Sequence, residues 1–316
     1  MTRWLVSVFL ILFSSFALGQ FPERPVKIIV PLTPGGSPDT IARAIAQGLQ
    51  GVWTQPVVVE NRTGGSQNIG SDIVAKSAPD GYTWLLAPDN VFSVNPYLGK
   101  QPFDPLADLA PVTQVARIQF LLVVHPSVPA NSVAELMAYA KAKPGELNFG
   151  SSGNGSPQHL GSTMLQLLTG TKMNHVPYKG AAPAIADLLP GRIQVWIGAA
   201  NTLLPHVKDN RLRLLASSAP ERFPNLGNVP TIGETVPGYA LDPWLGLFVP
   251  ARTPQETILK IHGEVVKILN SPDLKARLGP QGIELVTNSP ADFAKFIRDD
   301  NAKWGKIIKE AGIRGD

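Results

Sequence analysis

Residues 26–40 read VKIIVPLTPGGSPDT, and this stretch contains the pattern that recurs along the 316-residue chain. Residues 26–32 are almost wholly apolar, which is typical of a strand buried on both faces of a sheet. A Gly- and Ser-rich loop follows at 34–39, and apolar residues over 40–52 then recur at helical spacing. A buried strand, a glycine loop and an amphipathic helix in that order predict the first unit of an α/β sheet.

The alternation of strands and helices continues to the end of the chain. Ser132 and Glu135 form a capping-box pattern, which predicts that a helix begins there. Because strands alternate with helices and the connections are short, we expect parallel sheets with right-handed crossovers. Further strands are predicted at 57–60, 82–87, 120–124, 147–150, 175–178, 193–197, 212–216 and 244–249, and further helices at 69–76, 132–143, 254–269 and 290–311.

The length of the chain suggests two domains. No low-complexity linker separates two halves, so the chain is expected to pass between the domains on strands, near 120–124 and 240–246. We therefore assign residues 20–118 and 246–316 to lobe 1 and residues 119–245 to lobe 2. Each lobe is predicted to be built around one α/β sheet.

Residues 1–19 have the features of a cleavable signal peptide. Arg3 precedes an apolar run that is shorter than the ~20 residues needed to span a bilayer, and Ala17-Leu18-Gly19 supplies the small residues of a cleavage site. The chain has no cysteine, which excludes disulfides, thiolate metal sites and lipid attachment through an N-terminal cysteine. We expect a protein that is free in a bacterial periplasm and is not a lipoprotein.

The composition supports a globular protein without a nucleic-acid partner. Hydrophobic residues make up 44% and charged residues 16% of the chain. The net charge of +4 is small against 28 basic and 24 acidic residues, and the basic residues do not cluster. Glycine (29) and proline (30) together reach about 19%, against the ~12% that is usual, which indicates many turns.

Three loops share one design. Each follows the carboxyl end of a predicted strand and opens a helix, so that its backbone N–H groups can face an anion. For one such loop, an ordinary turn with Ser37, Asp39 or Ser156 as helix cap is the simpler interpretation; three in one chain favour a ligand cleft. The loops are Pro34-Gly35-Gly36-Ser37-Pro38-Asp39, Thr63-Gly64-Gly65-Ser66-Gln67-Asn68 and Ser151-Ser152-Gly153-Asn154-Gly155-Ser156.

Known catalytic and cofactor motifs do not match these loops. There is no P-loop, no G-x-S-x-G elbow and no histidine pattern of a zinc site, and the dinucleotide fingerprint fails at Gln158. His159 stands one turn after the third loop, and Tyr178 follows a further strand end. No cofactor and no metal are therefore predicted.

Eight sequence blocks in order identify the chain as resembling the extracytoplasmic solute receptors of tripartite tricarboxylate transporters, the Bug family. The resemblance covers essentially the whole chain after residue 20. The blocks are Phe21-Pro22-Glu23-Arg24-Pro25-Val26, Pro34-Gly35-Gly36-Ser37-Pro38-Asp39, Val59-Glu60-Asn61-Arg62, Pro79-Asp80-Gly81-Tyr82-Thr83, Ser152-Gly153-Asn154-Gly155-Ser156, His175-Val176-Pro177-Tyr178-Lys179-Gly180, Val229-Pro230-Thr231 with Glu234, and Phe248-Val249-Pro250-Ala251.

The resemblance implies a type II periplasmic-binding-protein fold, with two Rossmann-like α/β lobes joined by crossing strands and a ligand cleft between them. It implies a small organic carboxylate as ligand, such as a di- or tricarboxylate or an aromatic acid, and membrane permease subunits as partners. We expect a monomer. The ligand-binding residues that carry over are Gly35, Gly36, Ser37, Asp39, Ser66, Gln67, Asn68, Ser152, Gly155, Ser156, His159 and Tyr178.

The sequence departs from the family pattern at two places. Gln67 stands where the family usually has glycine, which would bring an amide into or beside the pocket. The family often has an aspartate after the strand at 193–197, where it can meet a ligand ammonium group, but this chain has Gly198-Ala199-Ala200-Asn201. A carboxylate without an amine is therefore favoured over an amino acid. Arg62 is expected to be structural.

Two alternatives stay open at the level of the sequence. One is a periplasmic α/β hydrolase that uses Ser156 and His159, which lie three positions apart and could share a helix face. The other is a ligand sensor that feeds a signalling kinase, because the same kind of cleft would serve that purpose. Binding without chemistry is the main prediction.

Overall fold

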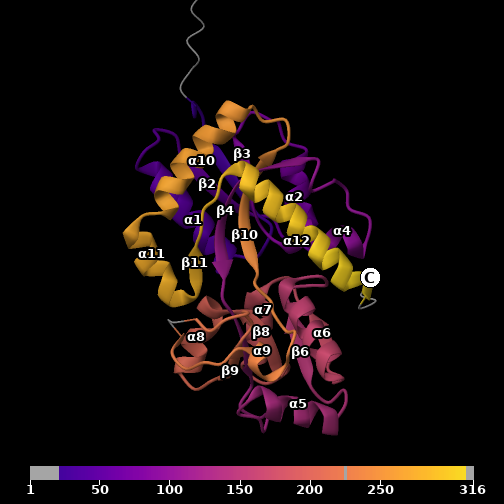
Figure 1. Ribbon diagram of the computed structural model, residues 1–316. Coiled ribbons are helices and arrows are strands. Elements are labelled where there is room, and N and C mark those ends of the chain that lie inside the picture. Colours follow the sequence, from indigo (N-terminus) through magenta and orange to yellow (C-terminus); the bar gives the residue numbers. More distant parts are fainter. Residues whose placement is uncertain (1–20, 224–225, 311–316) are drawn as a thin grey trace, which may run out of the picture.

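The computed structural model describes residues 21–223 and 226–310, and the predicted signal peptide lies outside them. Within these residues the chain forms two sheets, one in each of two lobes that lie one above the other in Figure 1. In lobe 1 the strand order is β11-β4-β10-β3-β1-β2, and in lobe 2 it is β7-β6-β8-β5-β9. None of the described helices combines the length and the apolarity needed to cross a membrane.

The strands and helices of lobe 1 come from both ends of the chain. Its strands are β1 (Val26–Val30), β2 (Val57–Asn61), β3 (Thr83–Pro88), β4 (Leu109–Ile118), β10 (Trp244–Pro250) and β11 (Ile283–Leu285). Its helices are α1 (Ser37–Gln50), α2 (Asn68–Ala75), α3 (Asn90–Ser93), α4 (Asn95–Leu98), α10 (Gln255–Leu269), α11 (Pro272–Leu278), the 3₁₀ helix η2 (Gly279–Gln281) and α12 (Pro290–Glu310).

Lobe 2 is built from the continuous stretch between β4 and β10. Its strands are β5 (Phe120–Val124), β6 (Asn148–Ser151), β7 (Asn174–Pro177), β8 (Val195–Ala199) and β9 (Arg213–Ser217). Its helices are α5 (Val133–Ala142), α6 (Pro157–Thr169), α7 (Ala181–Leu188), α8 (Ala200–Lys208) and α9 (Ile232–Thr235). The predicted boundary between residues 245 and 246 falls inside β10, which belongs to the sheet of lobe 1 from Trp244 onward.

The prediction of purely parallel sheets is wrong. Strands β1, β2 and β3 are parallel, as are β6, β7 and β8, but β10 runs antiparallel to both β3 and β4. In lobe 2, β5 runs antiparallel to β8 and β9. The physical reason is the route of the chain: β4, β5 and β10 are the segments that pass between the lobes, and no helical crossover returns them to the side from which they started.

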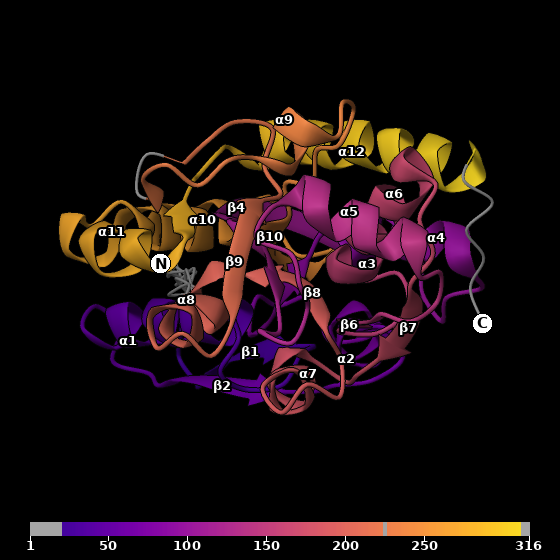
Figure 2. The same ribbon diagram turned by 90° about the horizontal axis from the view of Figure 1, so that it is seen from below.

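Helices cover both faces of each sheet, as the nearly all-apolar strands require. Alternate residues of β1 face opposite sides: Ile28 packs in the core with α1 and α10, whereas Ile29 packs with α2, α3 and α12. In lobe 2, Leu122 lies in the core with α5 and α6, and Leu121 lies in the core with α7 and α8. Figure 2 shows these two helix pairs on opposite sides of the lobe 2 strands.

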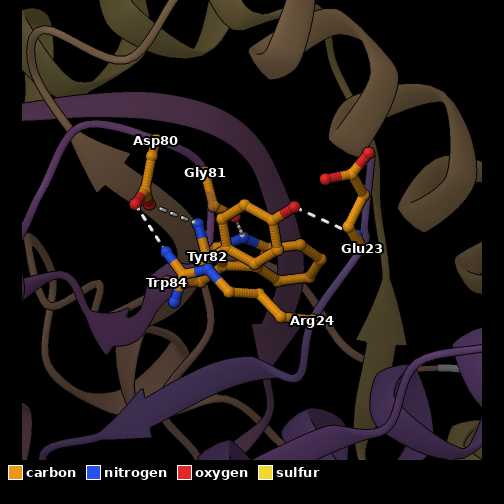
Figure 3. A network of polar contacts seen from close by, with 6 residues as sticks. All are labelled: Glu23, Arg24, Asp80, Gly81, Tyr82 and Trp84. Atoms are coloured by element: carbon orange, nitrogen blue, oxygen red, sulfur yellow. Dashed lines mark hydrogen bonds and ion pairs between the residues drawn. The ribbon is translucent and has the colours of Figure 1, made fainter. Parts of the chain in front are cut away.

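Residues of two of the sequence blocks form one structural cluster together with Trp84 (Figure 3). Arg24 forms an ion pair with Asp80 at 2.7 Å, and its guanidinium lies 4.0 Å from the centre of the Tyr82 ring. The Tyr82 hydroxyl accepts a hydrogen bond from the backbone N–H of Glu23, and Trp84 Nε1 donates to the Gly81 carbonyl oxygen. These contacts fasten residues 23–24 to the segment that leads into β3.

The chain passes between the lobes at two adjacent positions. Ile118 N donates to the Pro243 carbonyl oxygen at 2.8 Å, and Gln119 N donates to the Gly282 carbonyl oxygen at 2.8 Å. Arg117, at the end of β4, forms an ion pair with Asp242 on the returning segment. The outgoing and returning segments are therefore fastened to each other where they leave lobe 1.

Candidate ligand-binding cleft

A pocket lies between the two lobes and contains about 630 Å³ of empty space, including the part open to solvent. We call it the inner compartment. Its polar lining comes from both lobes and consists of Thr33, Gly36, Ser37, Gln67, Asn90, Ser152, Ser156, Gln158 and Thr202. Its apolar lining consists of Leu32, Pro38, Pro88, Ile118, Phe120, Pro157, Ala181, Ala199, Pro243, Trp244 and Leu245.

Five helices of eight or more residues begin at this pocket. The first turns or N-cap residues of α1, α2, α6, α7 and α8 contribute lining residues. The first N–H groups of a helix have no partner within the helix, and the helix dipole adds about half a positive charge at that end. Because none of the described residues that line the inner compartment carries a charged side chain, the backbone is the source of positive potential there.

The first loop places its residues in two different roles. Gly36 and Ser37 line the inner compartment, and Ser37 Oγ donates to Asn201 Oδ1 of lobe 2 at 2.7 Å. Asp39 does not line it, because its Oδ2 accepts hydrogen bonds from Gly35 N at 3.1 Å and from Arg43 Nε at 3.0 Å. Asp39 thereby holds the loop in shape.

The charge state of Asp39 fits this structural role. Burial alone would raise the pKa of the Asp39 carboxyl. Hydrogen bonds from Arg43, the Gly35 N–H and Asn61 outweigh burial and hold that pKa below its ordinary value. Asp39 is therefore an anion whose charge is already compensated at neutral pH.

The second loop has an unusual backbone. Gly64, Gly65, Ser66 and Gln67 all have positive φ, at 120°, 56°, 50° and 73°. Gln67 is the N-cap residue of α2; the residue is only 5% exposed and lines the inner compartment. The departure from the family pattern at Gln67 thus puts an amide into the pocket wall.

A chain of side-chain amides supports the second loop. Asn90 Nδ2 donates to Gln67 Oε1 at 2.6 Å and to Asn95 Oδ1 at 3.3 Å. Asn95 Nδ2 in turn donates to the Ser66 carbonyl oxygen at 2.7 Å and to Asn68 Oδ1 at 3.0 Å. Asn68 and Ser66 therefore belong to the support of the loop, and neither lines the inner compartment.

The third loop brings Ser152 and Ser156 to the inner compartment. Ser156 is the N-cap residue of α6, and its Oγ accepts the backbone N–H of His159 at 3.4 Å. His159 Nδ1 accepts the N–H of Gly155 at 3.1 Å. These bonds are those of a helix cap, and His159 and Gly155 do not line the inner compartment.

The His159 ring is part of an aromatic stack behind the loop. Its centroid lies 4.1 Å from that of His175, which stacks on Phe149 at 4.9 Å. His175 Nε2 lies 2.6 Å from Ser151 Oγ, and burial lowers the pKa of His175. This stack fixes the strand end from which the third loop departs.

Tyr178 and Ser66 line a second hollow, with about 1020 Å³ of empty space including open solvent, which we call the outer compartment. The Tyr178 hydroxyl donates to Asp187 Oδ2 at 2.9 Å. Burial, together with this hydrogen bond, raises the pKa of Tyr178 to about 12. Tyr178 is therefore a neutral wall residue at physiological pH.

Sequence reasoning missed four polar lining residues, namely Thr33, Asn90, Gln158 and Thr202. Asn90 Oδ1 and Gln158 Oε1 are buried and have no hydrogen-bond partner among the residues that the structure describes. A buried polar atom of this kind needs a partner from a ligand or from water. Ligands in α/β sheets bind outside the carboxyl ends of the strands. Asn90 could have been found in this way, since it follows the predicted strand at 82–87 by three residues.

The two lobes are in close contact around the cleft. A Cβ atom added at Gly180 would overlap Thr33 Oγ1, and one added at Gly155 would overlap Leu98 Cδ1. Both glycines belong to lobe 2, and Thr33 and Leu98 belong to lobe 1. Together with the bond between Ser37 and Asn201, these contacts describe a closed arrangement of the lobes.

A cleft between two α/β lobes, with an inner compartment whose described lining is formed by helix N-termini and uncharged side chains, defines a solute-binding protein of the periplasmic type. The chain belongs to the tripartite tricarboxylate transporter receptor family, because the sequence profile described as "Tripartite tricarboxylate transporter family receptor" matches residues 41–313. Protein BugT of Bordetella pertussis is 36% identical over 300 residues, which cover 93% of this chain and 91% of BugT.

Two solved structures of similar proteins carry small carboxylates. R. palustris Rpa4515 with adipate is 36% identical, has a TM-score of 0.90, and the match covers 94% of this chain and 100% of Rpa4515. MatC (Rpa3494) from Rhodopseudomonas palustris with bound malate is 27% identical, has a TM-score of 0.86, and the match covers 91% and 100% of the two chains. The resemblance in fold and the predicted solute-receptor function are thus confirmed.

Proposed function

We propose that this protein binds a small organic carboxylate in the inner compartment and delivers it to the membrane subunits of a tripartite tricarboxylate-type transporter. The observation that carries the proposal is the meeting of five helix N-termini at one uncharged pocket. Adipate in Rpa4515 and malate in MatC, two proteins of similar fold, support the same ligand class.

The proposed binding mode uses the backbone and small polar side chains. Gly36, Ser37, Gln67, Ser152 and Ser156 are proposed to face the ligand, because each lines the inner compartment. Oriented N–H groups can compensate a carboxylate without a buried lysine or arginine, whose desolvation would be costly. The apolar lining accommodates the carbon skeleton of the ligand.

The remaining predicted residues are proposed to shape the site. Asp39 and Gly35 hold the first loop, Asn68 belongs to the amide chain, and His159 with Gly155 fixes the third loop. Ser66 and Tyr178 face the outer compartment. The lobes are proposed to open and close around Gln119 and the 242–243 segment, which separate the two sheets.

Ligand binding is proposed to favour the closed arrangement, because a ligand that touches both lobes interacts more strongly with that state. The closed surface would then be the one that the permease subunits recognise. We further propose binding without catalysis, which is supported by the cap geometry of Ser156. Export by the predicted signal peptide at 1–19, and a free protein that is not a lipoprotein, complete the proposal.

A thermal-shift screen tests this function. The panel contains adipate, malate, succinate and benzoate, with neutral sugars and free amino acids as comparison ligands. At 100 times its dissociation constant a ligand stabilises the folded protein by ~2.7 kcal/mol, so a cognate carboxylate should raise Tm measurably. A rise with sugars or amino acids and none with any carboxylate would contradict the proposal.

A further inference from the structure

The inner and outer compartments meet at one wall. They share two lining residues, Gln67 of lobe 1 and Ser152 of lobe 2. Gln67 Nε2 donates to the Ser152 carbonyl oxygen across a long hydrogen bond of 3.5 Å. The Gln67 side chain and the Ser152 backbone therefore divide the cleft between the lobes into two parts.

The Gln67 side chain is held firmly on the lobe 1 side of this wall. Its Oε1 accepts from Asn90 Nδ2 at 2.6 Å. Gln67 is only 5% exposed, although it lies between two hollows that are both connected to solvent. The short hydrogen bond from Asn90 therefore fixes the position of the Gln67 amide. The longer hydrogen bond to the Ser152 carbonyl oxygen is the one that can break.

The backbone conformation of Gln67 is unfavourable for any residue that carries a Cβ atom. With φ at 73°, the residue has a left-handed conformation that glycine adopts at no steric cost and that other L-residues adopt only with strain. Such strain outside glycine often marks a functional position. A glutamine at this position therefore strains the backbone. Any advantage that offsets this strain must come from its amide side chain.

We propose that Gln67 is a specificity-determining residue that ends the inner compartment and thereby limits the length of the bound carboxylate. This inference rests on the proposed function. Short acids fit on the Asn90 side of the amide, where the helix N-termini lie. Longer α,ω-dicarboxylates would have to displace the amide to reach the outer compartment, where Lys179 is among the lining residues.

Calorimetric titration with succinate, adipate, suberate and sebacate tests the length limit. In the wild-type protein we expect affinity to fall sharply between two members of this series. Gln67→Gly removes the wall and suits the backbone, so it should raise the affinity for the longest diacids at least tenfold relative to the best short one. Gln67→Ala, which keeps the backbone strain and loses the amide, should shift the profile in the same direction.

Asn210→Gly is the matched control for the backbone effect. Asn210 is exposed, lines neither compartment and is another described non-glycine residue with positive φ, at 56°. This variant should keep the wild-type length profile. The same profile in wild type, Gln67→Gly and Gln67→Ala would overturn the role of Gln67 while leaving the proposed function intact. Absence of binding by every carboxylate of the thermal-shift panel and of this series would overturn the function itself, and the length limit with it.

Discussion

Ser37 of lobe 1, which lines the inner compartment, donates its hydroxyl hydrogen to Asn201 Oδ1 of lobe 2 at 2.7 Å. Ser37 is the first residue of α1, and Asn201 is the second residue of α8. The bond joins the N-terminal turns of two helices that belong to different sheets. It can form only when the lobes are closed, so its free energy contributes to closure.

Removal of this bond should weaken ligand binding. A hydrogen bond of this kind contributes ~1 kcal/mol, so Asn201→Ala is expected to lower the affinity for the cognate carboxylate about fivefold. Calorimetry on Asn201→Ala, Ser37→Ala and the double variant measures the coupling between the two side chains. Additive losses in the double variant would mean that the bond does not contribute to closure.

The contact between Gly180 and Thr33 predicts a second way to impair closure. Ala at 180 would place its Cβ against Thr33 Oγ1 with no room between them, so Gly180→Ala should reduce affinity tenfold or more. Gly170→Ala is the control, because Gly170 also has positive φ but no atom of residues 21–223 or 226–310 lies within 4 Å of the place that an added Cβ would take. Both variants should lose stability, Gly180→Ala the more, because Gly180 has φ 152° and ψ −179°, a region almost restricted to glycine, whereas Gly170 has left-handed helical backbone. Only Gly180→Ala should lose affinity. Equal affinities in the two variants would contradict the closed arrangement.

Ser156 should behave as a helix cap and not as a nucleophile. Its Oγ accepts a backbone N–H, and His159 Nδ1 accepts the N–H of Gly155. A fluorophosphonate probe is therefore expected to leave Ser156 unlabelled in an intact-mass measurement. Ser156→Ala should lower the unfolding free energy by ~1 kcal/mol, as the loss of an N-cap usually does. Labelling at Ser156 would instead favour the hydrolase alternative.

Asp89 predicts a pH dependence of stability. Burial and the nearby carboxylates of Asp300 and Asp242 raise the pKa of Asp89 well above its ordinary value of 3.8. The folded protein then binds this proton more tightly than the unfolded chain does, so the contribution of Asp89 to the unfolding free energy declines as pH rises above about 3.8.

The isosteric variant Asp89→Asn tests that dependence. It keeps an oxygen that can accept from Asn90 N, as Asp89 Oδ1 does at 2.8 Å, and it does not titrate. Urea unfolding between pH 4 and 8 should show a smaller decline for the variant, which should be the more stable protein at pH 8. If the unfolding free energies of the two proteins declined equally with pH, ionisation of Asp89 would not destabilise the folded protein.

Much of the architecture could be predicted because it is local. The stretch at 26–40 contains a strand, a loop and a helix start within 15 residues, and the structure has β1 and α1 there. Strand β4 was missed, because its polar residues Thr113 and Gln114 and its Pro111 interrupt the apolar pattern. Its partner β10 lies more than a hundred residues away, and periodicity carries no information about the direction in which such distant strands pair.

The candidate site was predictable to a similar degree. Glycine loops after strands indicate exposed N–H groups from the sequence alone, and Gly36, Ser37 and Ser156 do line the pocket. The pairing of Asp39 with Arg43, four positions later on the same helix, could have been predicted. The orientation of Tyr178 was not predictable, since it depends on its bond to Asp187. Such partners become known only when the fold has brought them together.

The position of β10 between β3 and β4 has a consequence for the order in which the molecule folds. The sheet of lobe 1 lacks its central strand until residues 244–250 have been synthesised, whereas every strand of lobe 2 lies in one uninterrupted stretch. Lobe 2 can therefore complete its sheet first, and the N-terminal strands must wait for a distant segment. Completion of the lobe 1 sheet is therefore expected to be the later event, because it requires segments from both ends of the described chain.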